Sequence, residues 1–159
     1  MQDGVLLTGH PALREGLVFG VMLGIISFGT NLLHNFLDSN TLISIIGVLF
    51  LSITIVLNLL AGVRASRQTG RVGTGALAGL IMELISFLFG VISILTELFV
   101  FNSKLHRLFQ SLSPTVTSEL AQQFITAQII SVVVILLLGA LIGAIGGLIG
   151  RRTQLPMNV

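Results

Sequence analysis

Residues 120–150 read LAQQFITAQIISVVVILLLGALIGAIGGLIG, a stretch with no charged side chain. As an α-helix it is about 46 Å long, and about 20 apolar residues are enough to cross a bilayer core. Three more apolar stretches precede it, at 16–33, 39–63 and 72–103, and only the last contains charged residues, Glu83 and Glu97. The sequence therefore predicts an all-α integral membrane four-helix bundle in one domain over 1–159, with helices at about 16–37, 41–63, 73–101 and 119–150.

Composition supports the same class of protein. Of the 159 residues, 53% are hydrophobic and 9% are charged, whereas a soluble domain has about 25% charged residues. A water-soluble enzyme is excluded. The chain has no cysteine, which excludes disulfides and thiolate metal sites, and its net charge of +2 implies no nucleic-acid surface. We expect a multi-pass protein of the plasma or inner cell membrane, in contact with the lipid bilayer and without a nucleic-acid partner.

Basic residues predict the orientation in the membrane. Lys104 and Arg107 fall on one side of the predicted helices, and six arginines fall on the other: Arg14, Arg64, Arg67, Arg71, Arg151 and Arg152. Because cytoplasmic loops are enriched in Lys and Arg, we expect both termini and the 64–73 loop in the cytoplasm. The segments 34–41 and 98–122 then face outward. Thr117 and Ser118 are good helix caps, so the fourth helix is expected to begin there.

The first and third predicted helices match when shifted by 59 positions. Gly16, Gly20, Gly24 and Ser27 then fall on four positions of the third helix: Gly75, Gly79, Glu83 and Ser86. The second and fourth helices match at a shift of 85. We interpret this as an internal duplication of two tandem hairpins, 16–67 and 75–152, in the same orientation. The alternative is a chance match, because Gly, Leu and Ile are common throughout the chain.

Glycines recur at four-residue spacing and predict close helix crossings. Lipid gives helices no hydrophobic reason to associate, so small residues that allow close backbone approach mark the contact faces. The predicted packing positions are Gly16, Gly20, Gly24, Gly75, Gly79, Gly139, Gly143 and Gly147. We favour packing within one chain over an interface between subunits.

Polar residues continue these stripes toward the predicted outer side, in steps of three and four. This spacing keeps one stripe facing a neighbour in a left-handed bundle. The predicted polar seam consists of Ser27, Asn31, His34, Asp38, Asn58, Ser86, Ser93 and Glu97. Such a seam is either a vestibule open to the exterior or a set of helix ends that reach the headgroups.

Glu83 lies near the predicted bilayer midplane, where ionisable groups are rare and are functional candidates. No Lys or Arg occurs at a comparable depth, so we expect a protonated, neutral carboxyl. One role is proton or cation transfer. Another is a hydrogen bond that fixes helix packing, with Ser27, Asn58 or Ser86 as the partner. A third is pairing with a cation from another subunit.

The sequence contains no recognisable catalytic or cofactor motif. His34, Asp38, Glu97 and His106 are possible metal ligands at the outer end, but their spacing matches no known ligand pattern. We therefore expect no enzyme activity, no metal and no cofactor. The favoured function is a structural or accessory subunit that assembles with other membrane subunits, as a homo- or hetero-oligomer. The alternative is a small ion or proton channel, or a transporter, that uses Glu83 and the outward-facing polar seam.

Overall fold

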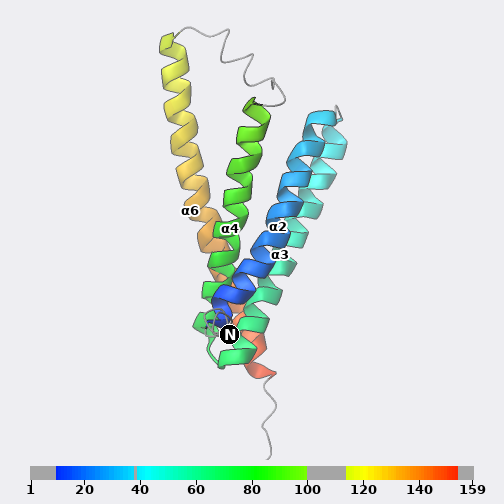
Figure 1. Cartoon of the computed structure of the whole chain (residues 1–159), viewed down its shortest axis with the longest axis vertical. Coiled ribbons are helices and arrows are strands. Elements are labelled where there is room, and N and C mark those ends of the chain that lie inside the picture. The colour runs from blue at the N-terminus through cyan, green and yellow to red at the C-terminus, as the bar shows by residue number, and fades with distance from the viewer. Residues whose placement is uncertain (1–9, 38, 100–113, 154–159) are drawn as a thin grey trace, which may run out of the picture.

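The computed structural model describes residues 10–37, 39–99 and 114–153, and these form four α-helices (Figure 1). The helices are α2 (Pro11–Phe36), α3 (Asn40–Thr69), α4 (Val72–Phe99) and α6 (Pro114–Arg152). Each contains a stretch long and apolar enough to cross a membrane, at Pro11–Leu33, Asn40–Thr69, Val72–Thr96 and Thr126–Arg152. The protein is thus all-α and a small integral, multi-pass membrane protein in contact with lipid.

Three of the helices are longer than the sequence analysis predicted. α2 begins at Pro11 rather than at 16, and α3 continues past Val63 to Thr69. α6 begins at Pro114 rather than at 117–118. The predicted ends followed the first charged or capping residue, but Arg is a good helix former and proline suits the first helical turn. The loss of hydrophobicity marks the membrane boundary and does not end the helix.

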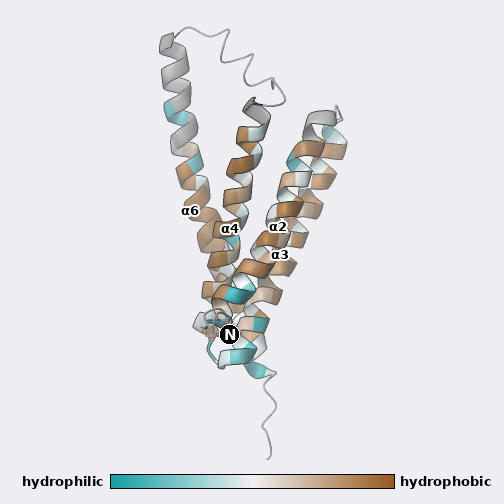
Figure 2. Ribbon diagram, in the orientation of Figure 1, coloured by the Kyte–Doolittle hydropathy of each residue, from teal (hydrophilic) through white to brown (hydrophobic). Residues whose placement is uncertain are grey.

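The four helices converge at one end of the molecule and diverge at the other (Figure 1). α4 packs against α2 and α6, and α3 packs against α6. We call the converging end, where α2 and α4 begin and α3 and α6 end, the packed end, and the opposite end the open end. Figure 2 shows hydrophilic residues at the packed end and also on the part of α6 nearer the open end. Of the six arginines that set the predicted orientation, five lie in these terminal parts of the helices and Arg71 lies in the turn between α3 and α4.

A tight turn joins α3 to α4 at the packed end. Gly70 adopts a left-handed conformation, with φ of 68°, and its N–H donates to the Ser66 carbonyl at 2.8 Å. Glycine is the usual residue at this position because it has no Cβ. The buried Ser66 hydroxyl donates to the Arg71 carbonyl at 3.0 Å. These bonds hold the start of α4 beside the end of α3.

The apolar core is small and lies in the packed half. Its members are buried side chains of α2, α3 and α4, including Phe19, Leu23, Ala61, Ala78 and Met82. Many large apolar side chains elsewhere are exposed, as far as 64% for Val48. Lipid tails are as apolar as these side chains, so their exposure in a membrane carries no hydrophobic penalty.

Candidate functional site

Glu83 is the twelfth residue of the candidate span in α4 and is only 6% exposed. Eleven residues of helix place it about 16 Å from the start of the span, near the middle of a core about 30 Å thick. Its side chain therefore faces protein at the depth where a charged group is most costly.

The Glu83 carboxyl is hydrogen-bonded to Asn58 of α3. The Asn58 Nδ2 donates to Glu83 Oε1 at 2.5 Å and to the Thr54 carbonyl at 3.2 Å. Asn58 is fully buried, and its Oδ1 has no hydrogen-bond partner in the described part of the chain. A neutral carboxyl has an O–H to donate, whereas a carboxylate accepts only. A protonated Glu83 thus supplies the kind of group that Asn58 Oδ1 lacks.

The Glu83 side chain also packs against Gly139 of α6. A Cβ at Gly139 would collide with the Glu83 Cγ and would lie 3.3 Å from its Cβ. Glu83 is therefore positioned by α4, bonded to α3 and packed on α6. Of the three partners that the sequence offered, the structure places Asn58 on the carboxyl, and Ser86 is buried one turn further along α4.

The crossing of α4 and α6 continues from Glu83 toward the packed end along glycines of both helices. A Cβ at Gly143 would lie 2.5 Å from the Gly75 carbonyl oxygen and 3.0 Å from the Gly79 Cα. A Cβ at Gly147 would lie 2.9 Å from the Val72 carbonyl oxygen. The two backbones are in direct contact here, so no larger residue fits without separating the helices.

Gly16, Gly20 and Gly24 of α2 lie against α4, where they meet side chains as well as the backbone carbonyls of Ala78 and Met82. A Cβ at Gly16 would be 2.7 Å from the Ile81 Cβ, and one at Gly20 would be 2.8 Å from the Ile85 Cβ. Gly24 lies against the Phe89 ring. The two stripes that align in the sequence therefore have different neighbours: the α2 stripe meets α4, whereas the Gly75 and Gly79 stripe meets α6.

The sequence analysis missed the third glycine-mediated contact, between α3 and α6. A Cβ at Gly150 would lie 2.5 Å from the Val63 carbonyl oxygen, Gly146 lies against Leu59, and Gly62 lies against Gly143. Gly146 and Gly150 follow the same four-residue spacing as the predicted stripe. That second glycine face on α6 was the signal for this contact.

The structure describes only some residues of the predicted polar seam. Ser86 and Ser93 are buried, and Ser93 Oγ has no hydrogen-bond partner among the described residues. Ser27 and Asn31 are half-buried on α2. Asp38 and the side chains of His34 and Glu97 lie outside the described residues, as do Lys104, His106 and Arg107. In the first half of α3, Ser44 and Gly47 are exposed, and the buried residues of this helix lie at Asn58 and beyond.

A charged cluster at the packed end was also missed. Glu15 is 5% exposed; its Oε1 accepts from the Arg14 Nη2 at 2.7 Å and from the Gln68 Nε2 at 3.1 Å, which ties α2 to α3. The Arg64 guanidinium lies 5.5 Å from the centre of the Phe19 ring, within the range of a cation–π contact. In the sequence, Glu15 directly precedes the apolar stretch 16–33 and was assigned no role. Its position on the side of the bundle that carries six arginines was the signal that could have predicted an ion pair.

No group of three or more metal-ligating side chains is found in the part of the chain that the structure describes. Comparison with protein-family models, curated proteins and solved structures gives no match. The functional interpretation therefore depends on the geometry of the helices and their buried polar groups.

Proposed function

We propose that this protein is a non-catalytic structural or accessory subunit of a larger membrane assembly. The observation that carries the proposal is the contrast between glycines at the two ends of the bundle. Among the helical glycines of the packed half, all but Gly73, which is exposed in the first turn of α4, touch a neighbouring helix. A Cβ at Gly29, Gly47 or Gly90, nearer the open end, would have no described atom of another helix within 4 Å. Because small residues mark close helix contacts in membranes, these positions fit helices of a partner subunit.

The length of α6 supports the same proposal. It has 39 residues, about 58 Å of helix, whereas the hydrocarbon core of a bilayer is about 30 Å thick. A helix that is longer than the core by this much offers a second surface for a protein partner.

Photo-crosslinking in the native membrane tests the proposal. A photoreactive amino acid at Gly47 fits the structure, because no described atom lies within 4 Å of a Cβ there. We expect a protein adduct at Gly47 and at Gly90. The control is Leu141, which is 61% exposed and should give lipid adducts. If all three positions give only lipid adducts, the accessory role is wrong.

The proposal includes an orientation, a location and an origin. Six arginines at the packed end favour placing both termini and the 64–73 loop in the cytoplasm, in a plasma or inner membrane.

An origin by duplication of hairpins 16–67 and 75–152 fits the α3–α6 contact, where the matched positions Ala61, Ala65, Gly146 and Gly150 are all buried. The different neighbours of the α2 and α4 glycines mean that the two halves have diverged in packing.

A second candidate function is a small proton or ion channel or transporter, and the buried polar groups of α4 favour it. Glu83, Ser86 and Ser93 lie on one helix, and Asn58 Oδ1 and Ser93 Oγ are available as hydrogen-bond partners for a permeating species. Proton flux in proteoliposomes separates the two functions. If the protein is a channel or transporter, the unmodified chain conducts protons and Glu83→Gln abolishes this flux. If it is an accessory subunit, neither the unmodified chain nor the variant conducts protons.

A further inference from the structure

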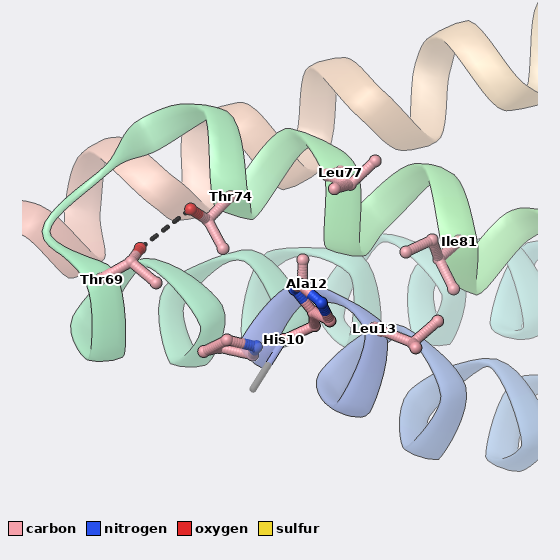
Figure 3. Close-up of a pocket in the computed structure, with 8 residues that line it drawn as sticks. His10, Ala12, Leu13, Thr69, Thr74, Leu77 and Ile81 are labelled. Atoms are coloured by element: carbon pink, nitrogen blue, oxygen red, sulfur yellow. Dashed lines mark hydrogen bonds between the residues drawn. The ribbon is translucent and has the colours of Figure 1, made fainter. Parts of the chain in front are cut away.

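A pocket of about 450 Å³ opens on the packed end, between the first turns of α2 and α4 (Figure 3). This volume falls in the range of roughly 300–1,000 Å³ that is usual for small-molecule sites. The pocket plays no part in the Glu83 site, which lies deeper in the membrane. It is separate from the glycine contacts between α4 and α6.

The lining of the pocket changes from polar to apolar along the helices. His10, Thr69 and Thr74 lie near the α3–α4 turn, and Leu13 and Ile81 lie farther along α2 and α4 (Figure 3). Thr74 and Ile81 are seven residues apart on α4, which is about 10 Å. Since a headgroup layer is about 5–8 Å deep, the pocket reaches from headgroup level to the first carbons of the acyl chains.

The charge around the pocket is positive. Arg71 is exposed in the turn between Thr69 and Thr74. Its backbone N–H donates to the Thr69 hydroxyl at 3.3 Å. Among the described residues of the packed end, Glu15 is the one acidic side chain, and it already accepts from Arg14 and Gln68. The N-termini of α2 and α4, which carry partial positive charge, lie at the same place. Arg71 does not itself line the pocket, but it lies in the turn between two residues that do, Thr69 and Thr74, so the nearest cation in the sequence is at headgroup level.

We propose that the pocket binds one anionic phospholipid. Its phosphate group lies beside Arg71, with the hydroxyls of Thr69 and Thr74 at the same level. The upper part of one acyl chain lies against Leu13, Leu77 and Ile81. The leaflet that bears anionic lipid is the cytoplasmic one, in agreement with the orientation proposed from the arginines. The lipid site holds for either candidate function.

Tryptophan fluorescence tests the site directly, because the chain contains no Trp and no Tyr. In Leu77→Trp the only indole is placed at the pocket, where Leu77 is 51% exposed. The protein is reconstituted in phosphatidylcholine vesicles that contain a small fraction of brominated phosphatidylglycerol or of brominated phosphatidylcholine. Bromine quenches an indole in contact with the chain. We expect brominated phosphatidylglycerol to reach half-maximal quenching at about fivefold lower mole fraction than brominated phosphatidylcholine. This factor corresponds to the attraction of one arginine near the membrane surface for anionic lipid.

Two matched variants separate the pocket from general attraction to the arginines. Ile149→Trp lies at the same end of the molecule, close to Arg151 and Arg152, on a lipid-exposed position of α6; it should show less than a twofold preference. Adding Arg71→Gln to Leu77→Trp should abolish the preference, whereas adding Arg151→Gln should leave it unchanged. Leu13→Trp provides a second reporter if Leu77→Trp does not fold.

Equal quenching by the two lipids at both pocket reporters would overturn the proposal. The same preference at Ile149→Trp would overturn it as well, because the lipid would then be attracted by the arginines as a group. No quenching by either lipid at both reporters would also overturn the proposal, because the pocket would then hold no lipid.

Discussion

Replacing Glu83 by leucine should destabilise the bundle by leaving Asn58 without its partner. Leucine keeps a carbon at the Cγ position that packs on Gly139, so the contact between α4 and α6 is retained. Asn58 keeps its 3.2 Å bond to the Thr54 carbonyl but loses the 2.5 Å bond to Glu83. Its amide is then a buried polar group with one N–H and Oδ1 unsatisfied.

The expected cost follows from two measured scales. An unsatisfied buried donor costs about 1–3 kcal/mol, and hydrogen bonds between membrane helices average about 0.6 kcal/mol with a maximum near 1.7 kcal/mol. We expect Glu83→Leu to lower the free energy of unfolding by about 1–2 kcal/mol. Glu83→Gln should cost less than about 0.5 kcal/mol, because an amide can both accept from Asn58 Nδ2 and donate to its Oδ1.

The assay is reversible unfolding in mixed micelles with increasing SDS, followed by the loss of helical circular dichroism. A double-mutant cycle with Asn58→Leu isolates the pair: the double variant should cost about 1 kcal/mol less than the sum of the single variants. Leu84→Ala, at the neighbouring exposed position, controls for general loss of side chain. The reasoning is refuted if Glu83→Gln lowers the free energy of unfolding as much as Glu83→Leu does. It is also refuted if the losses caused by Glu83→Leu and Asn58→Leu simply add in the double variant.

Three further predictions concern packing, orientation and the charged cluster. Gly143→Leu should prevent folding, because its Cβ would lie 2.5 Å from the Gly75 carbonyl oxygen, whereas Gly47→Leu should leave the SDS unfolding midpoint unchanged; equal midpoints would contradict the packing. Reporter fusions after Arg152 and within 64–73 should read cytoplasmic, and a reporter at 110–116 external; an external C-terminus reverses the orientation. Glu15→Ala should cost about 1 kcal/mol of unfolding free energy, since the bonds from the buried carboxyl to Gln68 and to the half-exposed Arg14 are lost. Arg151→Ala, at an exposed position, should cost nothing measurable, and a loss as large as that of Glu15→Ala would show a general charge effect.

The existence of four membrane helices could be predicted from the sequence because the physical constraint is strong. A charge-free run such as 120–150 has few stable forms in lipid other than a helix, since every backbone polar group must be bonded internally. The ends of the helices were less predictable. Hydrophobicity reports the membrane boundary, and α3 continues beyond it through Arg64 and Arg67 to Thr69.

The neighbour of each helix face could not be predicted. Spacing of three and four residues shows which residues share a face, but it does not show which helix that face meets. Gly24 and Glu83 align when the first helix is shifted by 59 positions onto the third, yet Gly24 lies against Phe89 of α4 and Glu83 bonds to Asn58 of α3. The burial of Glu15 likewise depends on Gln68, a residue 53 positions away in the chain.

The mass of the particle that contains this chain in its own membrane tests the accessory role most directly. Native mass spectrometry after extraction in mild detergent should show the 16.9 kDa chain in a complex with at least one further polypeptide. Photoreactive groups at Gly47 and Gly90 should join it to that same polypeptide. A single 16.9 kDa chain that carries only lipid, and that conducts protons in proteoliposomes, would contradict the account.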